Sequence, residues 1–202
     1  MTLIELIVAM SIFLIFVTLI IGTTVTLTKS ASRAQLVAES SNATVTVFGA
    51  LDRQTRYADS INYPGTGASG ARYVEFRTPG SSSASGITTC TQWRFVPSLA
   101  RLESRTWTDL TGSVPGAWAT KLNNMIDDGA DYPFSLIPAE VASGSRQQLV
   151  VKLHAGNGDL DAGAVVSTSF AARNSSYGSP SNPDANNDGV SDVRICPAGV
   201  RP

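Results

Sequence analysis

The sequence predicts an α+β fold in which one long N-terminal helix, about residues 1–57, packs on an antiparallel sheet of four to five strands. Three observations lead to this prediction. Residues 3–25 form an apolar segment, apolar side chains then continue at helical spacing, and short alternating segments separated by glycine, serine and proline follow. One helix followed by consecutive strands is typical of an α+β domain. The C-terminal region has few such patterns and is expected to be rich in loops.

The composition indicates one globular domain with an appendage. The chain has 202 residues, 15 basic and 16 acidic side chains, and a formal net charge of −1. This balance gives no general attraction to nucleic acid, so no direct nucleic-acid binding is predicted. Charged residues are few and small polar residues are plentiful, which we interpret as an extracytoplasmic domain. We therefore predict a transmembrane or filament-core helix at 1–28 and a globular domain at 29–202.

The N-terminal segment from Leu3 to Val25 is apolar apart from Glu5, one serine, one glycine and a few threonines. As a helix it spans about 35 Å, enough to cross the hydrocarbon core of a bilayer. A signal-peptide core is shorter and follows a basic region, whereas no Lys or Arg precedes Lys29 here. An ordinary single-pass anchor leaves Glu5 unexplained, because a carboxylate inside an apolar segment is costly unless it is paired.

The run MTLIELIVAM at residues 1–10 resembles the mature N-terminus of type IV pilins and pseudopilins. The resemblance implies that a prepilin peptidase removes a short leader and methylates the new amino group of Met1, which stands where phenylalanine is commoner. It also implies that Glu5 pairs with the positive N-terminus of a neighbouring subunit. A buried carboxylate needs a cation, and a helix docked at the wrong height would leave both charges unpaired. Glu5 is therefore predicted to set the register of assembly.

The helix is expected to continue past Lys29 and Arg33, which mark the exit from the apolar zone, to about Tyr57. Its second half should present an apolar stripe to the sheet. The predicted stripe consists of Ala34, Val37, Ala38, Val45, Phe48, Leu51 and Thr55. The run YPGTG at residues 63–67 breaks the helical pattern.

Five later segments have the alternation and composition of strands. They are residues 72–77, 91–96, 100–107, 147–153 and 164–172. A short helix is expected at 118–126, and the acidic turn at 157–161 is interpreted as a hairpin connection. The hairpin at 93–105 and the end of the last strand at 170–174 resemble minor pilins and pseudopilins of the J/W kind.

The two cysteines, Cys90 and Cys196, are predicted to form a disulfide, because an even number of cysteines outside the cytoplasm favours pairing. A bridge over this separation would fasten the C-terminal tail to the body of the domain. The alternative is two free, buried thiols.

The C-terminal run at residues 184–192 resembles the short calcium loops of extracellular repeat proteins. It places oxygen side chains at its first, third, fifth and ninth positions and glycine at its sixth, which suits a hard cation on a tight loop. The predicted calcium ligands are Asp184, Asn186, Asp188, the carbonyl of Val190, and Asp192. It is not a full EF-hand loop, because the twelfth position is Ile195. The alternative is a polar tail of Asx turns.

Catalytic patterns are lacking in the sequence. His154 is the one histidine and has no second histidine or cysteine nearby, and no nucleophile elbow, phosphate-binding loop or dinucleotide fingerprint occurs. Trp93, Trp107 and Trp118 can line a sugar-binding face, but core or cross-strand positions are more typical. We predict that the chain is not an enzyme.

The function predicted from the sequence is a structural subunit of a type IV pilus or related filament at the bacterial cell surface. Its partners would be other copies or other pilins, a prepilin peptidase and the inner-membrane assembly machinery, with the cytoplasmic membrane holding the chain before assembly. Two alternatives stay open. One is a minor pilin or pseudopilin that primes a secretion or DNA-uptake filament, and the other is a membrane-anchored adhesin.

Overall fold

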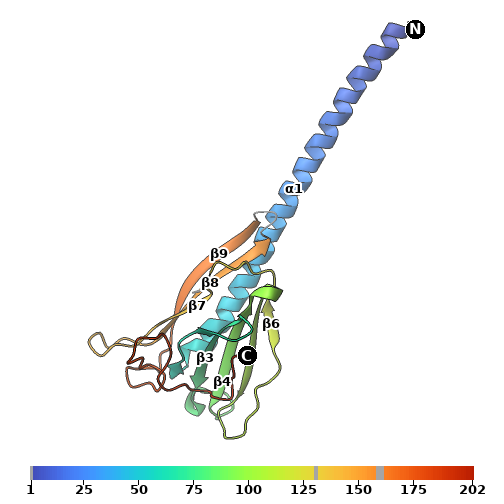
Figure 1. The fold of residues 1–202 in the computed structure, drawn as a ribbon. Coiled ribbons are helices and arrows are strands. Elements are labelled where there is room, and N and C mark those ends of the chain that lie inside the picture. The colour runs from blue at the N-terminus through green and yellow to red at the C-terminus, as the bar shows by residue number, and fades with distance from the viewer. Residues whose placement is uncertain (1, 130–131, 158–161) are drawn as a thin grey trace.

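The computed structural model describes residues 2–129, 132–157 and 162–202, and it confirms the predicted α+β architecture. A single helix, α1 (Leu3–Arg56), holds two antiparallel sheets against its second half. Its first half projects from the domain as a free rod (Figure 1). The helix has 54 residues and is about 81 Å long.

The helix α1 begins with a capping box. The Thr2 hydroxyl accepts the N–H of Glu5 at 3.4 Å, and the Glu5 carboxylate accepts the N–H of Thr2 at 3.0 Å. These bonds satisfy donors that the start of a helix otherwise leaves free, and the acid lies at the positive end of the helix dipole. The helix ends at Arg56, one residue before the predicted boundary, where Asp52 and Arg56 form an ion pair one turn apart.

The buried face of α1 differs in part from the predicted stripe. Leu51 and Thr55 are buried as predicted, but Val45 is 69% exposed and the two alanines of the stripe are also exposed. Thr44 and Val47 are buried instead. The prediction placed Val45 on the buried face because its side chain is apolar. In the structure the sheets cover the neighbouring side of the helix, which carries Thr44 and Val47. The Thr44 hydroxyl tolerates this burial because it donates to the carbonyl of Ser40 at 2.7 Å.

Sheet A contains six strands in the order β1-β3-β4-β5-β6, with β2 paired to β3. The strands are β1 (Ser60–Ile61), β2 (Gly65–Thr66), β3 (Arg72–Thr78), β4 (Thr89–Val96), β5 (Arg101–Thr108) and β6 (Ala119–Leu122). The predicted hairpin is β4–β5, joined by a single 3-10 turn at Pro97–Leu99. Alternate residues of β3 face opposite sides: Val74 and Phe76 point into the core against α1, while Tyr73 and Glu75 lie on the outer face.

Sheet B contains three strands in the order β7-β8-β9 and lies along α1 (Figure 1). They are β7 (Phe134–Ile137), β8 (Gln148–Asn157) and β9 (Ala162–Ala171). The strands expected in one sheet therefore form two. The expected hairpin connection includes residues 158–161, which lie outside the described residues. The strands before and after it, β8 and β9, pair with each other up to Asn157 opposite Ala162.

The predicted short helix at 118–126 is wrong, because this segment contains β6 and then bridges the two sheets. Trp118 lies between two guanidinium groups, with Arg94 and Arg105 at 3.9 and 4.2 Å from its ring centre. Farther on, Met125 forms a β-bridge with Ala155 of β8. These tertiary contacts outweigh the weak local helical pattern.

Candidate assembly surface and C-terminal clasp

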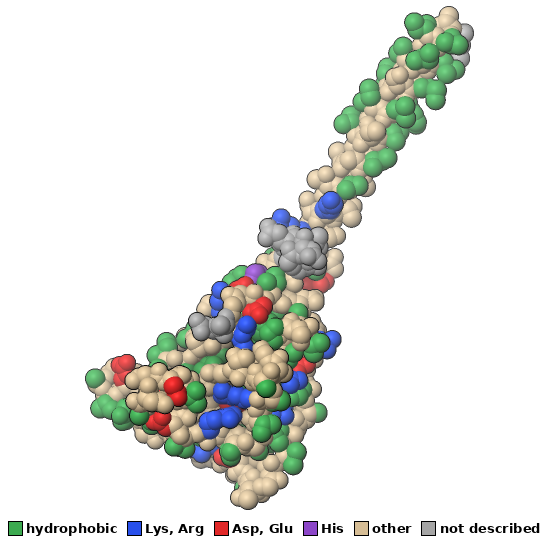
Figure 2. Space-filling model, in the orientation of Figure 1, with side chains coloured by type: hydrophobic (Ala, Val, Ile, Leu, Met, Phe, Trp, Pro, Cys, Tyr) green, Lys and Arg blue, Asp and Glu red, His purple; other side chains and the backbone are tan. Residues whose placement is uncertain are grey.

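The first half of α1 is an exposed apolar rod, which we define as residues 3–27. Its large apolar side chains other than Val17 are exposed, from 49% at Val25 to 81% at Leu3. Figure 2 shows these side chains along the projecting rod. By length and composition the helix can cross a membrane, and its most apolar stretch buries none of its residues in the domain. The structure is therefore compatible with membrane anchoring.

The hydroxyl groups of the rod are satisfied within the helix itself. Ser11 and Thr18 donate to the backbone carbonyls one turn earlier, each at 2.8 Å. The threonines at 23, 24 and 26, and Thr28 directly after the rod, do the same at 2.8–2.9 Å. An unsatisfied hydroxyl in an apolar medium costs several kcal/mol, so these bonds allow the rod to be surrounded by lipid or by other apolar helices.

Glu5 has a local partner at the tip of the rod. Its carboxylate oxygen Oε2 accepts the backbone N–H of Thr2 and lies 3.4 Å from the Thr2 hydroxyl. The pattern Thr2-x-x-Glu5 is a capping box that is readable in the sequence. Met1, the residue predicted for processing and methylation, lies outside the described residues. The pairing of Glu5 with another subunit's amino terminus stays a prediction.

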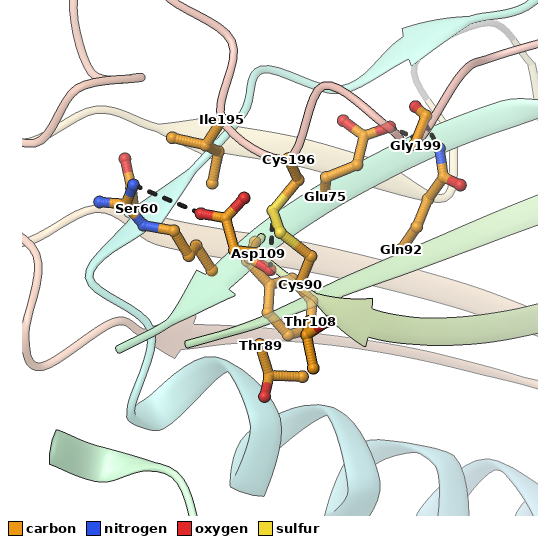
Figure 3. Close-up of a disulfide and its surroundings, with 12 residues drawn as sticks. Ser60, Glu75, Thr89, Cys90, Gln92, Thr108, Asp109, Ile195, Cys196 and Gly199 are labelled. Carbon is orange, nitrogen blue, oxygen red and sulfur yellow. Dashed lines mark hydrogen bonds and ion pairs between the residues drawn. A yellow bond between two sulfur atoms is a disulfide. The ribbon is translucent and has the colours of Figure 1, made fainter. Parts of the chain in front are cut away.

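The C-terminal residues 191–202 cross the outer face of sheet A, and we call them the C-terminal clasp. The disulfide between Cys90 of β4 and Cys196 confirms the predicted bridge, with Cα atoms 5.7 Å apart (Figure 3). Trp107 lies under the clasp, and a Cβ at Gly199 would come within 2.6 Å of its ring. The bridge spans a sequence separation of 106 residues. A loop of this length corresponds to about 4–5 kcal/mol in the loop-closure account.

Side chains of sheet A also hold the backbone of the clasp. The Asn62 amide donates to the carbonyl of Ile195 and accepts its N–H, both at 3.0 Å. The Gln92 amide donates to the carbonyl of Gly199 at 3.1 Å (Figure 3). At the end of the chain, Ser69 donates to the carbonyl of Pro202 at 2.6 Å. The clasp therefore forms a third layer on sheet A, opposite α1.

Glu75 of β3 is the buried charge at the centre of this layer. Its carboxylate is 0% exposed and accepts two bonds from Arg201, at 2.9 and 2.6 Å. Asn62 and Gln92 donate to it at 3.0 and 2.7 Å, and Arg194 lies 3.6 Å away. Burial on its own raises the pKa of Glu75, but Arg201, the Asn62 bond and the charge of Arg194 outweigh burial and lower the pKa below its usual 4.5.

The residues predicted to bind calcium share one exposed loop, which turns at Gly189 with φ of +76°. Asp184 accepts the N–H of Asp188 at 3.0 Å and that of Gly189 at 2.9 Å, and Asp192 accepts the N–H of Ala185 at 3.1 Å. These are the Asx-type bonds of the alternative interpretation. Across residues 2–129, 132–157 and 162–202, no group of three His, Cys, Asp or Glu side chains is placed to hold a metal. Calcium binding stays a prediction.

The other two calcium candidates face the same turn. The Asn186 amide donates to Asp188 at 2.9 Å, and the N–H of Val190 donates to the same carboxylate at 2.9 Å. The charges of this loop act on the side chain of Tyr63, which lies between β1 and β2. Burial raises the pKa of its phenol, and the charges of Asp184 and Asp192 raise it further.

His154 belongs to a polar cluster on the outer face of sheet B. Its Nδ1 lies 2.9 Å from Asp128, which also contacts the Lys152 ammonium at 3.1 Å. The hydrogen bond from His154 is the main cause that lowers the pKa of Asp128. The Tyr132 hydroxyl donates to the His154 carbonyl and accepts its N–H. Ser135 and Ser167 line the same pocket as Asp128, Tyr132 and Lys152.

The three tryptophans do not form a common exposed face. Trp93 is fully buried and donates to Gln54 of α1 at 2.9 Å, and Trp107 lies beneath the clasp. Trp118 is partly buried between its two arginines. The sugar-binding interpretation receives no support from this arrangement.

Sequence reasoning missed Glu75, its partners and the role of the clasp. The alternation in Tyr73-Val74-Glu75-Phe76 indicates that Glu75 faces away from the core. It does not reveal that a segment more than a hundred residues later covers that face. Comparison with known protein families, curated protein sequences and solved structures gives no match for this chain.

Proposed function

We propose that the chain is a structural subunit of a type IV pilus or related filament and that it polymerises through α1. The observation that carries this proposal is the division of α1 into an exposed apolar rod and a half that anchors a folded domain. Such a rod requires either lipid or other apolar helices around it, because water would contact its entire apolar surface. In this proposal lipid surrounds it first, and other copies replace the lipid during assembly.

The N-terminal sequence supports a specific assembly register. Glu5 is the one acid in residues 2–38, and in this proposal it pairs with the amino terminus of another copy, which a prepilin peptidase has exposed and methylated. The capping box holds the carboxylate at the tip of the helix, next to the position that the second charge would take. Each misplaced register would separate the two charges inside an apolar bundle.

Substitution of Glu5 tests the proposal with a matched control on the same helix. In the producing cells, Glu5→Ala should abolish sheared filaments, while Glu39→Ala, at an exposed acid bonded to Gln35, should leave them intact. Unfolding of the domain should be unchanged in both variants. Mass spectrometry of wild-type filaments should find a methylated amino group on Met1. A wild-type protein that stays single in the envelope, with Glu5→Ala fully functional, would favour the membrane-anchored adhesin instead.

A further inference from the structure

Trp118 forms the middle of three planar side chains that lie against one another on the outer face of sheet A. Its indole ring lies between the guanidinium groups of Arg94 on β4 and Arg105 on β5, with their Cζ atoms 3.9 and 4.2 Å from the ring centre. We call these three side chains the Arg-Trp-Arg stack. Figure 2 shows Lys and Arg side chains gathered over sheet A, so the stack belongs to a basic part of the domain surface.

The stack carries a positive charge that the fold does not neutralise. Arg94 pairs with Glu103 at 2.7 Å, whereas Arg105 has no ion-pair partner among the residues that the structure describes. Burial lowers the pKa of Arg105 and the charge of Arg94 lowers it further, which outweighs the charges of Tyr73 and Glu75 that raise it. Two like charges against one ring repel each other, and an anion beside them would relieve this repulsion.

Each member of the stack also has a donor that no acceptor uses among the described residues. Arg94 directs Nε and Nη2 to Glu103, and Arg105 directs Nε and Nη2 to a side-chain amide oxygen and a backbone carbonyl. The Nη1 groups of both arginines and the indole N–H of Trp118 remain. The Thr55 hydroxyl is the one buried side-chain polar atom without a partner in the described parts of the chain, so these three donors reach the surface.

A tetrahedral oxyanion suits these donors better than a carboxylate does. A carboxylate has two oxygens in one plane, which match the edge of a single guanidinium. The three terminal oxygens of a phosphate or sulfate monoester point in different directions, so each can accept from a different member of the stack. The arginines already cover the faces of the indole. Recognition would therefore depend on the oxyanion and not on the stacking of a sugar ring.

We propose that the Arg-Trp-Arg stack binds the phosphate or sulfate monoester group of a small ligand or surface glycan. The net charge of the chain, −1, gives no extended attraction to a polyanion, which favours a single charged group over a nucleic-acid backbone. This binding site goes beyond the proposed filament function. It lies on the face of sheet A opposite α1, so assembly through α1 would leave it open.

Nuclear magnetic resonance of the ¹⁵N-labelled full chain in detergent locates the binding site. The probes are glucose 6-sulfate and glucose 6-phosphate, with glucose as the control for the sugar ring and glucuronate as the control for a carboxylate. The indole N–H signal that disappears in Trp118→Phe belongs to Trp118. Both monoesters should shift this signal, glucose should not, and glucuronate should need a concentration at least about tenfold higher.

Three results of this titration would overturn the proposal. The first is an unchanged Trp118 signal with both monoesters. The second is glucuronate acting at the same concentration as the monoesters, which would remove the preference for a tetrahedral group. The third is a single-stranded DNA oligonucleotide that shifts the signal at a lower concentration than either monoester, which would identify a nucleic-acid site instead.

Calorimetry on variants separates the stack from general surface charge. Arg105→Gln should weaken the binding of glucose 6-sulfate by at least about tenfold, because a charged donor is lost. Trp118→Phe keeps a ring between the arginines but removes the N–H, so binding should weaken by about threefold or more. Arg53→Gln, at an exposed arginine of α1, should leave binding unchanged.

Thermal unfolding of each variant accompanies these measurements, because Arg105 also bonds to the carbonyl of Val200 in the clasp. If Arg105→Gln does not fold, the result for Trp118→Phe decides. Wild-type affinity in Trp118→Phe, or an equal loss of affinity in Arg53→Gln, would overturn the proposal.

Discussion

Replacement of Glu75 by glutamine should release most of the electrostatic stabilisation of the C-terminal clasp. Glutamine keeps the size of the side chain, so no cavity forms, but the guanidinium of Arg201 loses the negative charge it pairs with, and an amide NH2 replaces one of its two acceptor oxygens. The Arg201 side chain is only 13% exposed, so its charge would remain buried without compensation. Removing one partner of such a pair costs about 3–5 kcal/mol. For a domain of this size the melting temperature should fall by about 6–20 °C.

The pH dependence of this effect has a defined sign. The pKa of Glu75 in the folded protein lies below its usual 4.5. The stabilisation by the Glu75 carboxylate is therefore fully present above pH 4.5, and it is lost as the pH falls through the lowered pKa of the folded state. The stability difference between wild type and Glu75→Gln should therefore be constant at neutral pH and should narrow under acid conditions.

Urea unfolding of the full chain in detergent, followed by tryptophan fluorescence at neutral and acid pH, measures this difference. Glu140→Gln, at an exposed carboxylate, serves as the control and should change the unfolding free energy by less than about 0.5 kcal/mol. A loss below about 1 kcal/mol for Glu75→Gln at neutral pH, or a difference that does not narrow in acid, would refute the reasoning.

Three further predictions concern other parts of the domain. Replacement of Cys90 and Cys196 together by alanine should lower the free energy of unfolding by about 4–5 kcal/mol in denaturant titrations, and an unchanged value would show that the clasp needs no covalent closure. Calcium bound to the loop at Asp184 would neutralise the charges that raise the pKa of Tyr63, so added calcium should lower that pKa in a 295 nm titration, with no shift in Asp184→Ala. The Thr55 hydroxyl is buried without a hydrogen-bond partner among the described residues, so Thr55→Val should raise the melting temperature, whereas a lower one would reveal a hidden partner for this hydroxyl.

The local patterns of this sequence predicted the elements well and their arrangement less well. The helix boundary was one residue from the observed end at Arg56, because capping and turn residues act locally. The five predicted strands all exist, but they are divided between two sheets, and the bridge from Met125 to Ala155 of β8 joins residues thirty positions apart. Trp118 was expected at the start of a short helix, whereas it directly precedes β6, and the two arginines against its ring lie on β4 and β5.

The candidate sites divide in the same way. Glu5 was recognised because the apolar residues around it in the sequence make an acid conspicuous there. The disulfide was predictable because the sequence contains only two cysteines. The partners of Glu75 come from positions as distant as Asn62 and Arg201, so no sequence window contains them. The exposure of Val45 was likewise hidden, because only the positions of both sheets reveal that this residue lies outside the core.

Because α1 continues without a break from the rod into the domain, the number of residues between them fixes how far the domain is rotated about the helix axis. Each residue advances a helix by 1.5 Å and turns it by 100°, so one inserted residue between Lys29 and Arg33 would swing the domain by that angle about its own axis. A seven-residue insertion would restore the facing to within about 20° while lifting the domain by about 10 Å. The number of residues between rod and domain thus sets the direction in which each copy presents its outer loops.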